Sequence, residues 1–160
     1  MNIWTITNWK KNLNHNARRR IGLRFRYEKN VDPEVKRACV QFAIWLRQNY
    51  EFPLRVVVYV KATKTFNTQD GDEVVGSFFE PYSYSDEPYI KIATGDYVEL
   101  VYSLGKDSAL ATILASLSHE LTHYYQWINN IHLTEKGREQ QAIWYSKYII
   151  DKYAMTCEHP

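Results

Sequence analysis

The residues of this chain best suited to chemistry are His119, Glu120 and His123, which stand in the pattern His-Glu-x-x-His. On a helix, residues four apart project from the same face, so both imidazoles can reach a single Zn²⁺ at about 2.0–2.1 Å. Glu120 is rotated by about 100° from His119 and can lie beside the metal without binding it. Two ligands and one neighbouring base are what metal-assisted hydrolysis of a peptide bond requires.

The pattern lies in a stretch that predicts a long helix from Asp107, its expected N-cap, to about Asn129. Apolar residues recur there at three- and four-residue steps: Leu110, Leu114, Leu117, Leu121 and Ile128. Because such a helix is covered on much of its circumference, the histidines are not expected to be casual surface residues. A chance match to the pattern is therefore the less favoured interpretation.

A catalytic zinc site usually has three protein ligands, so one more is needed. The metzincin pattern would place Gly at position 126 and His at position 129, where this chain has Gln126 and Asn129, and this excludes that class. His132 and Glu135, in and just after the expected turn between helices, remain as alternatives.

Glu139 is the preferred third ligand, because it lies sixteen positions after His123, one helical hairpin later. Ala142 and Ser146 share its row on the next helix. Small residues there would let the two helices approach closely and bring Glu139 to the histidines.

Composition limits the class of protein. The 160 residues are 45% hydrophobic and 15% aromatic, with a net charge of +2, which indicates a globular domain and does not suggest nucleic-acid binding. The two cysteines, Cys39 and Cys157, are far apart, so neither a disulfide framework nor a Cys-x-x-Cys metal pair is expected. No signal peptide or membrane-spanning run is found, so a cytoplasmic protein without membrane association is expected.

The elements around the site predict an α+β fold. We expect residues 1–160 to form one domain, in which residues 1–19 are an irregular N-terminal segment. Asp32 and Pro33 predict the start of a helix that backs the sheet and ends near Tyr50. Thr134 is the expected cap of the last helix, which runs to about Tyr153, and residues 96–106 remain unassigned. Alternating or β-branched runs predict a twisted sheet of about four strands, at residues 20–27, 54–61, 74–80 and 89–94.

The first of these strands has a basic outer face with Arg20, Arg24 and Arg26, preceded by Arg18 and Arg19. This run could bind an acidic partner. A charged strand face that resists aggregation is the favoured interpretation.

Taken together, His-Glu-Leu-Thr-His-Tyr-Tyr-Gln and the downstream Glu139 resemble the gluzincin group of zinc metallopeptidases. The chain is similar in particular to the ImmA/IrrE-type peptidases and the minigluzincins. In those families a Gly-x-Phe segment and an Ile-x-Ile strand precede the active helix, as Gly76-Ser77-Phe78 and Ile90-Lys91-Ile92 do here. The resemblance covers roughly residues 54–150 and implies a zincin-like fold.

The resemblance also implies one zinc ion held by His119, His123 and Glu139, with Glu120 as general base in the hydrolysis of a peptide or protein substrate. The expected substrate lies extended along an exposed strand edge, for which residues 89–94 are the best candidate. The alternative is a zinc-binding regulator or structural protein of a mobile element that has the fold but does not cleave.

One position departs from the pattern of the relatives, and one catalytic role has no assigned residue. Several gluzincins place an Asp, which supports a histidine ligand, where this chain has Ile143. The oxyanion-stabilising residue of larger relatives has only candidates here: His132, Tyr145, Tyr148 and Tyr153.

The final segment contains Cys157 and His159, which could cover the metal and keep the site latent. The tail would have to double straight back over about 20 Å, so an unattached terminus is the favoured expectation.

Overall fold

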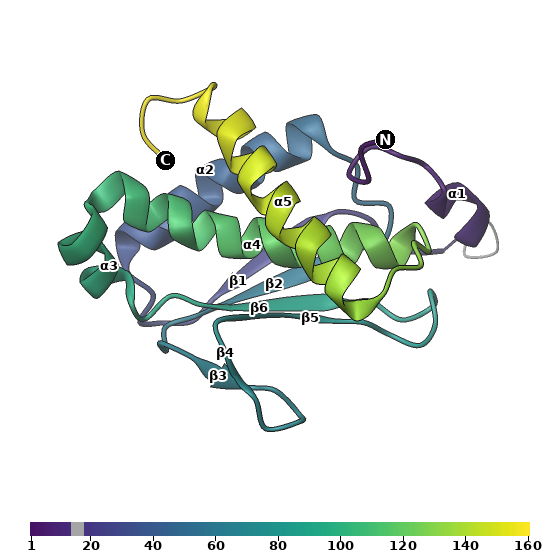
Figure 1. Ribbon diagram of the computed structural model, residues 1–160, viewed down its shortest axis with the longest axis horizontal. Helices are drawn as coiled ribbons and strands as arrows, with labels where there is room; N and C mark the ends of the chain where they lie inside the picture. Colours follow the sequence, from purple (N-terminus) through teal and green to yellow (C-terminus); the bar gives the residue numbers. More distant parts are fainter. Residues whose placement is uncertain (14–17) are drawn as a thin grey trace.

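A computed structural model of the chain describes residues 1–13 and 18–160, and it confirms the expected α+β fold. Helices α2 (Pro33–Asn49), α4 (Lys106–Ile128) and α5 (Glu135–Ala154) lie over one face of the main sheet, and a small hairpin projects beyond the sheet on the other side (Figure 1). Within the part of the chain that the structure describes, none of the helices combines the length and hydrophobicity of a membrane-spanning segment.

The main sheet has four strands in the order β1-β2-β6-β5. They are β1 (Leu23–Tyr27), β2 (Val56–Lys61), β5 (Gly76–Phe79) and β6 (Tyr89–Ala93). The first three in the spatial order run parallel, and β5 pairs with β6 in the antiparallel direction. Side chains of β1 alternate between the two faces of the sheet. Leu23 is buried beneath the helices, whereas Arg24 and Arg26 are exposed, as expected for the basic outer face of this strand.

The expectation that residues 89–94 form the exposed edge is wrong. Strand β6 is paired on both sides, with β2 and with β5, and its Ile90 and Ile92 are buried. The antiparallel strand β5 occupies the edge, and its side chains are only partly buried or exposed. The stretch expected as a single strand at 74–80 is divided, because Glu73–Val74 (β4) pairs with Phe66–Asn67 (β3) in a separate two-stranded ribbon.

The helices begin and end close to the expected residues. In α2 (Pro33–Asn49), Asp32 caps the first turn by accepting a hydrogen bond from the Glu34 amide at 2.9 Å. In α5 (Glu135–Ala154), Thr134 does the same for the Gly137 amide at 3.0 Å.

The unassigned segment before the long helix is itself helical. It forms α3 (Tyr97–Leu104), and Gly105, with φ of 85°, separates it from α4 (Lys106–Ile128). The cap of α4 is therefore Gly105, which corrects the expectation for Asp107. The carboxylate of Asp107 instead contacts His159 Nδ1 at 2.7 Å.

That contact shows where the final segment goes. Arg37 on α2 donates a hydrogen bond to the Pro160 carbonyl at 2.8 Å, so the tail is docked against α2 and the start of α4. The tail is neither unattached nor placed over the histidines, which contradicts both expectations for it. Its polar anchors, Arg37 and Asp107, lie far from it in sequence and could not be recognised there.

The N-terminal segment lies against the C-terminal half of α4. It contains a short helix, α1 (Trp9–Asn12), where the sequence predicts only irregular structure, and residues 14–17 lie outside the described part. Trp4 is buried and donates its Nε1–H to Thr122 Oγ1 at 3.1 Å. The Ile3 amide donates to the Tyr145 hydroxyl at 3.1 Å, so the segment ties α4 to α5.

Candidate metal centre

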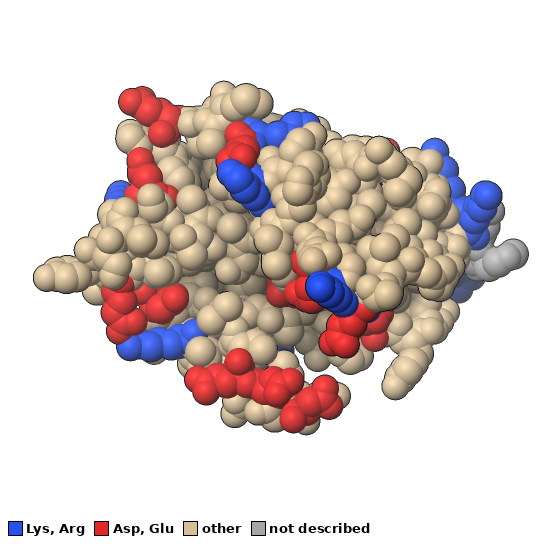
Figure 2. Space-filling view, viewed as in Figure 1, with Lys and Arg blue, Asp and Glu red and all other residues tan. Residues whose placement is uncertain are grey.

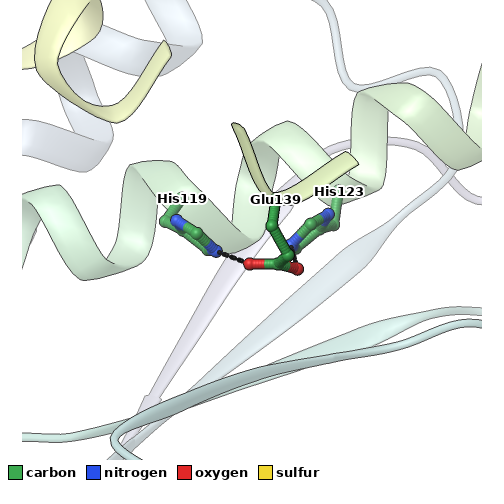
Figure 3. A group of neighbouring side chains, drawn as sticks. All are labelled: His119, His123 and Glu139. Carbon is green, nitrogen blue, oxygen red and sulfur yellow. Dashed lines mark hydrogen bonds and ion pairs between the residues drawn. The ribbon is translucent and has the colours of Figure 1, made fainter. Parts of the chain in front are cut away.

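The structure brings together the three side chains that the sequence singles out as ligands. Each offers one ligand atom, and these atoms of His119, His123 and Glu139 all lie within 4.8 Å of one another. Figure 3 shows both imidazoles pointing from α4 toward the carboxylate that comes from α5. Glu139 Oε2 is 3.1 Å from His119 Nε2, and Oε1 is 3.0 Å from His123 Nε2.

These distances suit a metal ion. Two ligands at about 2.0–2.1 Å from a tetrahedral ion are roughly 3.3 Å apart, so a small outward movement of the carboxylate would admit one. The donor set of two imidazole nitrogens and one carboxylate oxygen is also a set that metal ions bind in proteins. The group could therefore hold a metal ion. Among the described residues, no fourth His, Cys, Asp or Glu joins it.

The alternatives for the third ligand lie nearby but outside this group. Glu135 lines the same cavity as the histidines without joining the ligand atoms. His132 lies in a neighbouring cavity with Tyr84 and Arg138.

The close approach of α4 and α5 depends on the small residues of the second helix. Ala142 is fully buried, and Ser146 lines the cleft opposite Thr112. The exposed Ile143, at the position where several gluzincins have an Asp, leaves the site without support from that residue. Support for His123 comes instead from Gln126, whose Oε1 is 2.7 Å from His123 Nδ1.

Glu120 lies beside the ligands and outside their group. Its side chain is directed at β5, where a Cβ added to Gly76 would lie 2.9 Å from Glu120 Oε1. Glycine is therefore required at position 76 for Glu120 to keep its place. Burial, and then the negative charge of Glu139, raise the pKa of the Glu120 carboxyl to about 8.

The pKa of His123 is shifted in the opposite direction. Its burial lowers the pKa of the imidazole, while the hydrogen bond with Gln126 and the charge of Glu139 oppose that change. A lowered pKa favours the neutral imidazole, which is the form that binds metal.

Two cavities meet at the site and form one cleft. One, of about 680 Å³, extends between β4 and the first half of α4, and the other, of about 620 Å³, extends past His123 toward Arg138. Both are lined by Gly76, His119 and Glu120. Acidic side chains of the β3–β4 hairpin, including Asp70, form the outer lip of the cleft, where Figure 2 shows a cluster of carboxylates.

The tyrosines considered for oxyanion stabilisation are engaged elsewhere. Tyr145 donates its hydroxyl hydrogen to the Met1 carbonyl, Tyr148 stacks on Trp144, and Tyr153 packs on Phe42.

Two residues were not recognised as functional from the sequence: Gln126, which contacts His123, and Arg138, which lines the cleft. Gln126 had a usable signal, because a residue three positions after His123 lies on the same helical face. Arg138, whose guanidinium is 3.7 Å from Glu80, had none beyond its place next to Glu139.

Comparison of the chain with models of protein families, with curated proteins and with solved structures finds no match, so the candidate site rests on its own geometry.

Proposed function

We propose that the chain is a zinc-dependent metallopeptidase in which His119, His123 and Glu139 hold the metal and Glu120 is the general base. One observation carries the proposal: a group of two histidines and a glutamate opens onto the same cleft as a buried carboxylate that does not belong to the group. The resemblance of these residues to the gluzincin pattern supports the same assignment.

Zinc is the metal that we assign to this donor set. Three protein ligands drawn from histidine and a carboxylate, with a position left open, are typical of catalytic zinc. When bound, Zn²⁺ polarises a carbonyl and makes a water molecule acidic near neutral pH.

Glu120 supplies the proton transfers. In the proposed mechanism its carboxylate accepts a proton from the attacking water and delivers it to the leaving amine. Burial raises the pKa of this carboxyl, and a divalent cation nearby would act in the opposite direction.

The edge strand β5 offers the place for an extended substrate. One side of β5 pairs with β6, and its other side has no strand partner among the residues that the structure describes. Gly76 at its start lines both cavities. A peptide that pairs with this edge would pass the metal ligands and Glu120 along the cleft.

The test compares the wild type with Glu120→Gln. Both should contain one zinc per chain by elemental analysis, and cleavage of a peptide library should fall by about 10²–10⁴-fold in the variant. A Glu120→Gln variant that cleaves as well as the wild type would overturn the mechanism. A zinc-loaded wild type that cleaves nothing would favour the non-cleaving regulator instead.

A further inference from the structure

Gln126 occupies an unusual place for a polar side chain. It is 1% exposed, near the end of α4 and one turn after His123. Each of its polar atoms has a partner, and these partners lie on both helices of the metal centre.

The orientation of the amide follows from one of these partners. Gln126 Nε2 lies 3.1 Å from the Arg138 carbonyl oxygen and 2.9 Å from Gln141 Oε1. A backbone carbonyl can only accept a hydrogen bond, so the NH₂ group must face Arg138. The opposite orientation would set two acceptor oxygens against each other. Gln126 Oε1 therefore faces His123.

The orientation of the amide in turn fixes the tautomer of His123. Gln126 Oε1 can only accept, and it lies 2.7 Å from His123 Nδ1, so Nδ1 must carry the hydrogen. In the neutral imidazole Nε2 then has its lone pair free. That lone pair faces Glu139 Oε1 at 3.0 Å. Because the nitrogen and the oxygen are then both acceptors, a cation between them is favoured.

His119 has no corresponding support. Its Nδ1 has no hydrogen-bond partner among residues 1–13 and 18–160, and its side chain is 23% exposed, against 9% for His123. His123 is thus oriented by Gln126 before metal binds, whereas His119 is held through its contact with Glu139.

Gln126 also connects the two helices at the level of the ligands. Arg138, whose carbonyl it binds, directly precedes Glu139 in α5. A single side chain on α4 therefore contacts one ligand and the backbone beside another.

We propose that Gln126 is the positioning residue of the metal centre, which holds His123 as the Nδ1–H tautomer with Nε2 directed at the metal and sets Glu139 opposite it. This inference rests on the proposed metal site and not on the proposed peptidase activity. Groups that orient a ligand histidine are commonly worth about 10–100-fold in metal affinity.

The first experiment reads the tautomer directly. Long-range ¹H–¹⁵N spectra of the metal-free wild type, above about pH 7.5, should show His123 with its hydrogen on Nδ1. A hydrogen on Nε2 would overturn the proposal. Because this measurement uses the wild type, its result does not depend on a variant that folds.

The second experiment measures zinc affinity by competition with a chromophoric chelator. Gln126→Leu should bind zinc about 10–100-fold more weakly than the wild type, and its His123 signals should lose the single Nδ1–H form. Gln140→Leu is the matched control, since Gln140 is exposed on α5, and it should bind zinc as the wild type does. Unchanged affinity in Gln126→Leu would overturn the proposal.

The two proposals fail in distinguishable ways. The wild type could bind zinc, carry the His123 hydrogen on Nδ1 and yet hydrolyse nothing. That result would support the role of Gln126 and contradict the proposed peptidase activity.

Discussion

The two halves of the proposed site are built by different physical means. The metal half consists of polar contacts between neighbouring helices, and the side chain of Glu139 is 53% exposed. The base half is buried: Glu120 is 8% exposed and packs against Gly76, which lies across the layers on β5. Metal binding should therefore depend on donor atoms and hydrogen bonds, whereas catalysis should also depend on the fit between helix and sheet. Each half can then be damaged while the other survives.

Removing a ligand should have the largest effect, because it destroys the metal half outright. His119→Ala, His123→Ala and Glu139→Ala should each lower zinc affinity by more than about 100-fold, beyond the range expected for supporting groups. Elemental analysis after dialysis measures the loss. Glu135→Ala is the control from the same cavity and should keep its zinc. Full zinc content in Glu139→Ala would transfer the role of third ligand to Glu135 or His132.

Acid should also act on the metal half first. Protons compete with the metal for imidazole nitrogen, so bound zinc should be constant near pH 7–8 and fall below about pH 6. The lowered pKa of His123 delays protonation of that ligand and does not prevent it. Metal content measured across the pH range tests this, and zinc retained in full at pH 4 would exclude a site that depends on two histidines.

A methyl group at position 76 should damage the base half alone. The Cβ of Gly76→Ala would lie 2.9 Å from Glu120 Oε1, and the end of this side chain can move aside without disturbing the backbone. We expect cleavage to fall about 10–100-fold with unchanged zinc content, since displaced catalytic groups lose rates of this order. Ser77→Ala, the next residue on β5, is the matched control. Loss of zinc in Gly76→Ala would show that the halves are not separable.

The smallest effect should appear in the stability of the metal-free protein. The pKa of Glu120 is raised to about 8 in the folded chain, from 4.5 for an ordinary glutamate. As pH rises between these values, the unfolded chain ionises first and the folded state loses stability. Metal-free Glu120→Gln should therefore exceed the wild type by about 1–3 kcal/mol at pH 9, and by much less at pH 5. Urea unfolding with a chelator present measures both, and equal differences at the two pH values would contradict the burial of this carboxyl.

The metal half was the more predictable of the two from sequence. His119 and His123 follow from helix geometry, and Glu139 follows from one short turn and the small residues Ala142 and Ser146, so few alternatives arise. The helices themselves, with caps at Asp32 and Thr134, are specified by local preferences. Local spacing thus accounts for the residues that the structure brings together.

The base half depends on pairings that no local pattern records. Whether residues 74–80 or 89–94 form the sheet edge is decided by the competition of both strands for β2, and the more apolar strand, with Ile90 and Ile92, takes the buried place. The place of Gly76 against Glu120 follows only from that outcome. The docking of the tail on Arg37 and the helical turn at Trp9 likewise depend on contacts between distant parts of the chain.

The contact between Ile3 and Tyr145 has a consequence for synthesis on the ribosome. The two residues are 142 positions apart, so at 5–20 residues per second Tyr145 is made roughly 7–30 s after Ile3. Trp4 must likewise wait for Thr122 on α4. During that interval Ile3 lacks Tyr145 and Trp4 lacks Thr122, although Trp4 can already pack against Tyr50. The contacts through which this segment joins α4 to α5 can therefore form only after Tyr145 has been made.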